Sequence, residues 1–280
     1  MPELPEVETM VRGIRPRLIG ATLTDFAECP CACRPLLVVP SIAEMRKRTI
    51  GQPIADVRRR GKRAIIELEN REAFIIEPRM TGLLLLGDPP SVEHLRLYWS
   101  VESAGVASKC WFWDRRGLGT VRLMSESERE ANLESGQLGP EVLSMSLEEW
   151  WKALSRTSRP IKVALLDQKL FAGIGNLYAS EILHLAKVSP MAASNRISRG
   201  RVERIRHAAV HVLETAILYE GSTLADGTYR NALNQNGSYQ NQHRVYARQG
   251  ETCRTCGLGI IRRIVQAQRA TFYCPRCQRR

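Results

Sequence analysis

The segments Cys253-Arg254-Thr255-Cys256 and Cys274-Pro275-Arg276-Cys277 carry the strongest spacing signal in this chain of 280 residues. In each segment a tight turn brings two thiols to one side, where both can reach the same ion. Four thiolates leave no coordination position open, as in structural zinc sites, which contribute on the order of 10–16 kcal/mol of apparent binding free energy to small units. We therefore predict one structural Zn²⁺ at Cys253, Cys256, Cys274 and Cys277, with a redox dithiol as the alternative.

The residues between the two cysteine pairs have the pattern of a hairpin. We expect strands at 260–265 and 270–273, with a turn at 266–269 that displays Arg269 at its tip. The planar guanidinium of an arginine suits a two-pronged contact with phosphate. An ordinary solvated arginine is the other interpretation of this position.

The composition points away from several classes of protein. Hydrophobic residues make up 44% of the chain and charged residues 25%, which is typical of folded globular proteins. No apolar run approaches the roughly 18 residues that a membrane helix needs. The amino-terminal stretch also lacks the basic and apolar parts of a signal peptide. We expect a soluble, cytoplasmic monomer without a membrane partner.

The charge of the chain favours a polyanionic partner. Its 41 Lys and Arg residues exceed its 29 Asp and Glu residues by 12. Seven arginines and no acidic residue lie in 253–280, so the carboxyl-terminal tenth of the chain carries much of the excess. Nucleic-acid-binding proteins have such a basic footprint, although net charge alone also serves solubility.

The hydrophobic pattern changes twice along the chain. Helical spacing after Pro5 gives way, from about 54 to 124, to short apolar runs separated by Gly, Pro, Asp and Ser. After 140 the pattern is helical, with the longest helix at about 200–219 and a polar loop at 221–243. We predict an α+β multidomain fold: a helix with a β-sandwich at 1–126, a helical domain at 127–243 and the zinc hairpin at 244–280.

A glycine-rich turn at 173–176 opens one of these helices. Its unpaired backbone N–H groups and the positive end of the helix dipole favour an anion. The turn is not a P-loop, because no Lys-Ser or Lys-Thr follows it. A plain structural turn is the alternative.

The amino terminus carries residue types that can act as a nucleophile and a proton donor. A small residue at position 2 permits removal of the initiator methionine, which would leave the secondary amine of Pro2 at the chain end. An α-amine titrates near pH 8, so it is a better nucleophile at neutral pH than an unperturbed lysine. Glu3 is adjacent and can transfer protons. Without further context, a simple lead-in to the helix explains the same residues.

Four segments taken together resemble the bacterial formamidopyrimidine-DNA glycosylases, in that family's order over the whole chain. They are MPELPEVET at 1–9, GK at 61–62, GIGNLYASE at 173–181 and QRATFYCPRC at 268–277. The resemblance implies a β-sandwich domain, a helix–two-turn–helix domain and a zinc hairpin. It also implies a bifunctional glycosylase and lyase of base excision repair, whose partner is double-stranded DNA with oxidised bases or abasic sites.

The resemblance assigns catalytic roles to Pro2, Glu3, Lys62 and Arg269. The Pro2 nitrogen attacks C1′ of a flipped nucleotide carrying 8-oxoguanine or a formamidopyrimidine, the base leaves, and the Schiff base undergoes β- and δ-elimination. Glu3 donates a proton in base loss and Lys62 in β-elimination, while Arg269 acts in δ-elimination and grips phosphate. Flipping is required because a stacked duplex hides C1′ and the base face.

The resemblance also assigns DNA contacts, with departures from the family pattern. Met80, Arg116 and Leu118 stand where the family fills the space left by the flipped base with Met, Arg and Phe. Leucine stacks less well than an aromatic ring, so discrimination of the opposite base is expected to differ.

Three further DNA contacts follow from the same resemblance. Lys162 and Asn176 are expected at phosphates. His94 is carried over as a DNA contact, although Val92 aligns with the contacting histidine of the family.

Two other functions remain open. Because Leu118 departs from the family pattern, an endonuclease VIII-like glycosylase for oxidised pyrimidines is one alternative. A non-catalytic module that binds lesion DNA would use the same scaffold, and the presence of Pro2, Glu3 and Lys62 argues against it.

Three further patterns receive simpler interpretations. His207 and His211 lie one helical turn apart, but alanine follows His207 where a zinc protease has glutamate, so we expect a solvated helix face. Cys29, Cys31 and Cys33 lack a fourth ligand nearby in sequence, so we expect a loop there. The arginines at 58–60 are expected to face phosphate.

Overall fold

The computed structural model describes residues 2–131, 138–224 and 227–279 and divides the chain into two compact units. Unit 1 comprises Met1–Ser135 and Ile217–Gln240, and unit 2 comprises Gly136–Ala216 and Asn241–Arg280. The expected α+β multidomain class is confirmed. The three-part division at 126 and 243 stays a prediction, and the structure assigns 217–240 to the same compact unit as the amino-terminal residues.

Unit 1 is built on two β-sheets. The first has the order β1-β7-β8-β6 with antiparallel pairing, and the second has the order β2-β9-β5-β4-β3, in which only β2 runs parallel to its neighbour. Alternate residues of β7 point into the core, as the spacing of Leu97 and Trp99 predicts. The strands are β1 (Thr22–Glu28), β2 (Leu37–Val39), β3 (Ile54–Arg60), β4 (Arg63–Leu68), β5 (Ala73–Glu77), β6 (Gly82–Leu85), β7 (Leu95–Ser103), β8 (Val106–Asp114) and β9 (Thr120–Met124).

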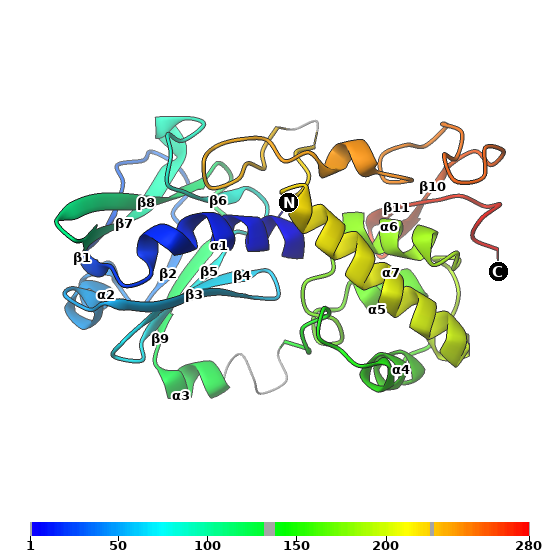
Figure 1. Cartoon of the computed structure of the whole chain (residues 1–280), viewed down its shortest axis with the longest axis horizontal. Helices are drawn as coiled ribbons and strands as arrows, with labels where there is room; N and C mark the ends of the chain where they lie inside the picture. The colour runs from blue at the N-terminus through cyan, green and yellow to red at the C-terminus, as the bar shows by residue number, and fades with distance from the viewer. Residues whose placement is uncertain (1, 132–137, 225–226, 280) are drawn as a thin grey trace. The chain divides into compact units, whose positions relative to one another are not determined.

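Helix α1 (Leu4–Leu18) lies against both sheets, because it contacts β3, β4 and β6 (Figure 1). Proline in its first turn fits the helix, since that position needs no backbone N–H. Val7, Met10 and Ile14 are fully buried in the core between the sheets. Two shorter helices, α2 (Ile42–Thr49) and α3 (Glu126–Arg129), complete this part of unit 1.

The polar segment expected as a loop at 221–243 is more ordered than the sequence suggests. Only 225–226 lie outside the described residues, and the rest of 217–240 packs within unit 1. Tyr229 and Ala232 belong to the buried core of the sandwich. The carbonyl of Ala232 accepts hydrogen bonds from the N–H groups of Leu86 and Gly87, at 2.8 and 3.3 Å.

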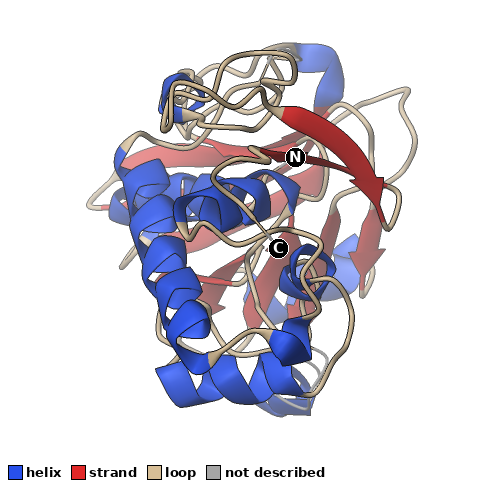
Figure 2. Ribbon diagram, turned by 90° about the vertical axis from the view of Figure 1, so that its right-hand side faces the viewer, coloured by secondary structure: helices blue, strands red, loops and turns tan. Residues whose placement is uncertain are grey.

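Unit 2 contains the longer helices of the second half of the chain. The predicted long helix is confirmed as α7, the longest blue helix in Figure 2. Within the described part of the chain, no helix has the length and apolar character needed to cross a membrane. The helices are α4 (Leu147–Ser155), α5 (Ile161–Leu165), α6 (Asn176–Leu185) and α7 (Arg199–Leu218), with short 3₁₀ turns at Ser194–Arg196 and Tyr239–Gln242.

The carboxyl-terminal hairpin pairs β10 (Arg262–Gln266) with β11 (Arg269–Tyr273). Ala267 and Gln268 form the turn, and both have positive φ, as a two-residue hairpin turn requires. The sequence placed Arg269 in the turn, but Arg269 is the first residue of β11, paired with Gln266. The difference arises because the turn is two residues long, so the strands extend closer to the tip.

A buried carboxylate joins α6 to the chain that leads into the zinc segment. Glu181 is 1% exposed, and its two oxygens accept the backbone N–H groups of Arg244, Val245 and Tyr246 at 2.8–3.0 Å. Burial raises the pKa of Glu181, and these hydrogen bonds oppose the rise. Glu181 therefore satisfies three consecutive N–H groups that no regular element pairs.

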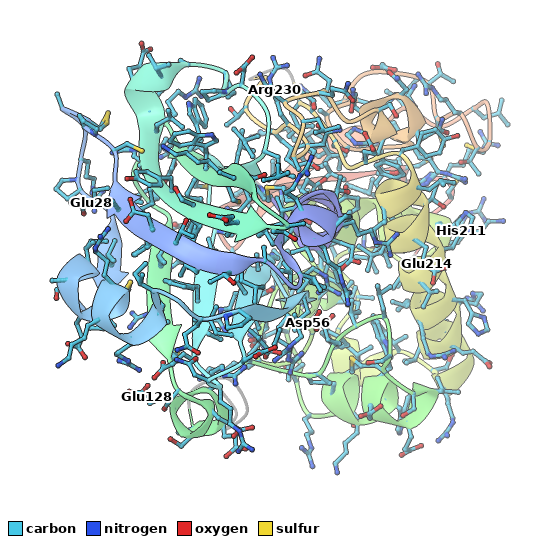
Figure 3. The ribbon with its side chains drawn as sticks, turned by 60° about the vertical axis from the view of Figure 1, so that its left-hand side comes forward. Glu28, Asp56, Glu128, His211, Glu214 and Arg230 are labelled. Carbon is cyan, nitrogen blue, oxygen red and sulfur yellow. A yellow bond between two sulfur atoms is a disulfide. The ribbon has the colours of Figure 1, made fainter. Side chains whose placement is uncertain are left out.

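Substitution of Glu181 tests this connection. Glu181→Ala leaves the three N–H groups without their acceptor, and each costs on the order of 1 kcal/mol. The free energy of unfolding should therefore fall by about 3 kcal/mol in chemical denaturation. Glu214→Ala, on the exposed side of α7 (Figure 3), is the matched control and should change it little. Equal losses in the two variants would contradict the assignment.

Candidate nucleic-acid interface and metal centre

The amino-terminal candidates Pro2 and Glu3 are both buried in unit 1, at the start of α1. The backbone N–H of Glu3 donates to a carboxylate oxygen of Glu6 at 2.9 Å, and the N–H of Ser222 donates to the other oxygen, also at 2.9 Å. Glu6 thus ties the catalytic candidates to the segment at 217–240. Met1, whose removal the sequence predicts, lies outside the described residues.

Lys62 lies in the turn between β3 and β4 and is half-buried. Arg59 donates to the carbonyl of Gly61 in that turn at 2.9 Å and pairs with Glu8 of α1 at 2.9 Å. Burial raises the pKa of Glu8, but the hydrogen bonds of Arg12 and Arg59 outweigh it and lower the pKa below its ordinary value. The ionised Glu8 therefore anchors the Lys62 turn to the helix that begins at Pro2 and Glu3.

The residues expected at the base gap gather around Asp114. Asp114 is fully buried, bonds the hydroxyl of Thr81, and accepts the N–H groups of Arg116 at 3.1 Å and Gly119 at 2.8 Å. The N–H of Arg116 also donates to the Thr81 hydroxyl at 3.0 Å. The turn that carries Met80 and the turn that carries Arg116 and Leu118 are thereby joined, with Arg116 exposed and the other two half-buried.

His94 is the last residue of a 3₁₀ helix at Val92–His94. Its ring meets Trp113 edge-on with 5.4 Å between ring centroids. Val92, which aligns with the contacting histidine of the family, is exposed. The DNA contact expected for His94 stays a prediction.

Unit 2 brings together Lys162, Asn176 and the hairpin strand β11. The ammonium of Lys162 donates to Oδ1 of Asn176 at 2.6 Å, to the carbonyl of Ala270 at 2.8 Å and to the hydroxyl of Thr271 at 2.8 Å. Lys162 is 0% exposed. Its burial favours a role in positioning Asn176 and the hairpin over the direct phosphate contact that the sequence predicts.

Asn176 and Arg269 are more accessible than Lys162. Asn176 is half-buried at the first position of α6, after Gly175, at the positive end of the helix dipole. Arg269 is exposed beside the hairpin turn and directly precedes Ala270, whose carbonyl Lys162 holds. Two residues that are predicted to contact phosphate are thus held, directly or through a neighbouring residue, by one buried ammonium.

The salt dependence of DNA binding distinguishes the two roles of Lys162. Lys162→Met removes the donor for three acceptors on α6 and β11, so affinity for an abasic-analogue duplex should fall by about tenfold. If Lys162 only positions its neighbours, the slope of log Kd against log salt stays unchanged, whereas loss of a direct phosphate contact lowers it by about one. Lys152→Met, at an exposed site on α4, is the control. A lowered slope for Lys162→Met would show that Lys162 contacts a phosphate directly.

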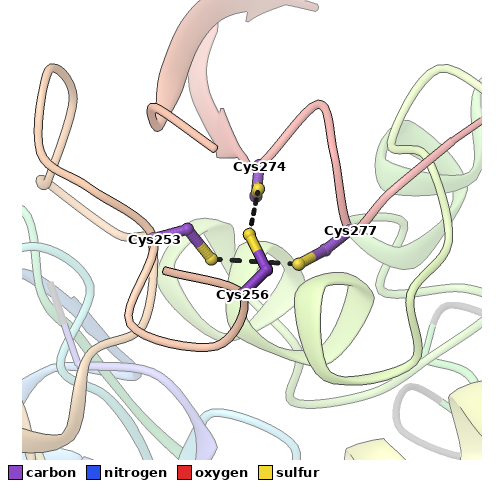
Figure 4. Close-up of side chains that lie close together, drawn as sticks. All are labelled: Cys253, Cys256, Cys274 and Cys277. Atoms are coloured by element: carbon purple, nitrogen blue, oxygen red, sulfur yellow. Dashed lines mark hydrogen bonds between the residues drawn. The ribbon is translucent and has the colours of Figure 1, made fainter. Parts of the chain in front are cut away.

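The four predicted zinc ligands converge (Figure 4). All four Sγ atoms lie within 4.8 Å of one another, with 3.9 Å between Cys253 and Cys277 and 3.8 Å between Cys256 and Cys274. Two sulfurs at about 2.3 Å from one zinc are roughly 3.8 Å apart, so the cluster fits a tetrahedral ion.

Backbone groups favour the thiolate form of one of the four ligands, Cys256. The N–H groups of Leu258 and Gly259 lower the pKa of Cys256 to about 6. A side chain at Gly259 would come within 2.5 Å of Cys274 Sγ, so only glycine fits there. With Zn²⁺ bound, the four cysteines would fix the hairpin beside α6, so the residues on β11 would keep their positions.

His184 is a further contact that the sequence did not reveal. It lies on α6, is 2% exposed, and its Nε2 is 3.5 Å from Cys253 Sγ. Burial, together with Arg244 and Arg248, lowers the pKa of His184 to about 4, so the ring is neutral at physiological pH. A neutral ring with its proton on Nε2 donates to the thiolate, as outer-shell partners of metal ligands do.

Removal of one thiol tests the metal centre. Cys256→Ser should lose the structural ion and weaken binding to lesion DNA by at least about tenfold at physiological salt, because the hairpin is too small to fold without the ion. Metal analysis and a binding isotherm measure the two effects. Cys110→Ala removes a thiol from the core of unit 1 and should retain the ion. Full affinity without the ion would refute the role of the hairpin.

Several supporting residues were missed or misjudged at the level of sequence. Glu6 stands three residues after Glu3, the spacing of a capping box, and that signal was available. Arg59, expected to face phosphate, is nearly buried against Glu8, because one position of a charged run can point inward from a strand. His207 and His211 are exposed on α7, as expected, and Figure 3 labels His211.

Three family models match consecutive parts of the chain. The formamidopyrimidine-DNA glycosylase N-terminal domain matches residues 1–121, and the formamidopyrimidine-DNA glycosylase H2TH domain matches 138–227. A zinc finger found in FPG and IleRS matches 250–280.

Whole proteins and solved structures match over nearly the full length. The formamidopyrimidine-DNA glycosylases of Chloroflexus aurantiacus and Rhizorhabdus wittichii are 36% and 38% identical, covering 99% and 100% of this chain and 98% and 100% of theirs. The MutM (Fpg) protein of Thermus thermophilus superposes with a TM-score of 0.85 at 34% identity, covering 99% of this chain and 98% of that one. A Lactococcus lactis FPG mutant bound to Fapy-dG-containing DNA gives 0.88 at 30% identity, with both chains fully covered.

Proposed function

Because the chain belongs to the formamidopyrimidine-DNA glycosylase family, we propose that its Pro2 nitrogen removes oxidised purines from double-stranded DNA and then cuts the strand. The protein is a DNA glycosylase of base excision repair, and its partner is DNA that carries oxidised bases or abasic sites. The observation that carries the proposal is the full-length family match together with Pro2 and Glu3 at the start of α1.

The reaction begins with a secondary amine at Pro2, once Met1 has been removed. Its lone pair bonds to C1′ of a flipped nucleotide, the C1′–N bond to the base breaks, and Glu3 supplies the proton that the base needs. The amine then releases its proton, the C1′–O4′ bond of the sugar ring breaks and O4′ takes up a proton, which leaves the ring nitrogen double-bonded to C1′ as an iminium Schiff base. The amine suits this step because an α-amine titrates near pH 8, so a far larger fraction of it is neutral at pH 7 than of an ordinary lysine.

Two eliminations follow from the Schiff base. Loss of a proton from C2′ expels the 3′ phosphate in β-elimination, for which Lys62 is the proposed proton donor, and δ-elimination expels the 5′ phosphate with the help of Arg269. Arg59 and Glu8 support this assignment of Lys62, because they fix its turn to α1. The exposed guanidinium of Arg269 can offset charge on the departing phosphate.

The proposed DNA grip uses both units separately. In unit 2, Asn176 and the first turn of α6 bind phosphate, with Lys162 holding them in place. In unit 1, Met80, Arg116 and Leu118 fill the space that the flipped base leaves. The joined turns at Thr81 and Asp114 support this assignment. Because its substrate is DNA, we also propose that the protein acts in the cytoplasm, at the nucleoid.

Substitution of Pro2 tests the nucleophile. Pro2→Gly should reduce borohydride trapping on 8-oxoguanine DNA by at least about tenfold, because glycine replaces the secondary amine, while duplex affinity stays within about twofold. Mass spectrometry of the trapped wild-type complex should locate the adduct at residue 2. An adduct on a lysine side chain, or equal loss of trapping and binding, would show that Pro2 is structural.

Leu118 favours comparison with a second substrate class. Because a leucine wedge stacks weakly, an endonuclease VIII-like preference for oxidised pyrimidines is the second candidate. Excision of 8-oxoguanine opposite C and of thymine glycol opposite A, measured side by side, separates the two. Faster excision of thymine glycol would show that oxidised pyrimidines, and not oxidised purines, are the preferred substrates. Binding to both lesions without excision of either would show that the protein is a non-catalytic module that binds lesion DNA.

A further inference from the structure

The cysteine triplet that the sequence left as a loop gains a partner in the fold. Cys29 directly follows Glu28, the last residue of β1, and Cys31 and Cys33 come before β2 (Figure 3). The three cysteines border one pocket of about 160 Å³ in unit 1. Cys31 and Cys33 are joined as a disulfide, and Cys29 is a free thiol.

The missing fourth donor comes from the 3₁₀ helix at Val92–His94. Nδ1 of His94 is 3.6 Å from Cys33 Sγ, and the carbonyl oxygen of Glu93 is 2.9 and 3.3 Å from the sulfurs of Cys31 and Cys33. A sulfur and a nitrogen bound tetrahedrally to one zinc are roughly 3.5–3.6 Å apart. The separation between Cys33 and His94 therefore already suits a shared ion.

The surroundings of His94 resemble the outer shell of a metal site. Its Nε2 lies 4.0 Å from the carboxylate of Glu93, and its Nδ1 lies 3.6 Å from Cys33 Sγ. Trp113 holds the ring edge-on. The guanidinium of Arg96, which also borders the pocket, can offset the negative charge of several thiolates around a divalent ion.

We propose that Cys31, Cys33 and His94, with Cys29 as the neighbouring thiol, form a second site for a thiophilic divalent ion such as Zn²⁺. The site is open only in the reduced protein. An external dithiol breaks the Cys31–Cys33 bond, becomes a disulfide itself, and passes its two protons to the cysteine sulfurs. The ion then displaces these protons as the Zn–S bonds form.

Arg96 connects the cysteine segment to the turn that carries Arg116 and Leu118. Arg96 donates to the carbonyl of Arg34 at 2.9 Å and to that of Asp114 at 2.7 Å, so it joins the cysteine segment to the turn. Gly117 has positive φ, and a side chain there would come within 2.7 Å of the Arg34 carbonyl. Ion binding is independent of the proposed function, whereas any effect on the wedge rests on it.

Metal stoichiometry of the full-length protein tests the proposal. After reduction and removal of the reductant under nitrogen, the wild-type protein should bind two Zn²⁺ per chain, and Cys31→Ser/Cys33→Ser should bind one. Co²⁺ at the second site should show thiolate-to-metal absorption that the double variant lacks. His94→Ala should weaken the second ion by about tenfold or more, and His207→Ala, an exposed histidine on α7, should not.

The alternatives give distinct results. One ion in the reduced wild-type protein would mean that the cysteines serve only as a disulfide, and two ions in the double variant would place the second ion elsewhere. Either result overturns the proposal. Each variant that retains the structural ion in the carboxyl-terminal hairpin is folded. If the double variant does not fold, His94→Ala provides the test instead. The ions are counted in the absence of DNA, so a negative result would refute the second metal site without bearing on the proposed glycosylase activity, which the trapping assay tests.

Discussion

The buried ammonium of Lys162 is the interaction on which the geometry of unit 2 depends. A charged group removed from water costs several kcal/mol unless its protons find acceptors, and here three oxygens supply them. Those oxygens belong to the first residue of α6 and to two residues of β11. The charge can stay satisfied only while Asn176 and the hairpin keep their spacing, so the start of α6 and the strand that begins at Arg269 form one arrangement.

Unit 1 uses carboxylates in the corresponding way. Glu6 fixes the residues before α1, Glu8 fixes the Lys62 turn through Arg59, and Asp114 fixes the two turns at the base gap. Each carboxylate is largely buried and accepts bonds from groups on more than one segment. The groups proposed to touch DNA stand on turns, while the groups that hold those turns lie beneath them, as preorganised sites require.

The local parts of this architecture were predictable, and the long-range parts were not. The cysteine spacing predicted the metal cluster, and helical periodicity predicted α7 within one residue at each end. β1 and β8 escaped prediction because charged residues such as Asp25 and Lys109 interrupt their apolar runs. The burial of Lys162 and the joining of Cys33 with His94 depend on partners far along the chain, which no window of sequence contains.

The interleaving of the two units along the chain has a consequence for the order of synthesis. Gly13 of α1 lies so close to Ala232 that an added side chain would come within 2.4 Å of it, so the first helix is covered by residues made more than two hundred positions later. A nascent chain therefore emerges from the ribosome with part of its amino-terminal core still open to solvent. Residues 136–216 of unit 2 are synthesised inside that interval, and the exposed apolar surface makes the early chain a natural client for chaperones.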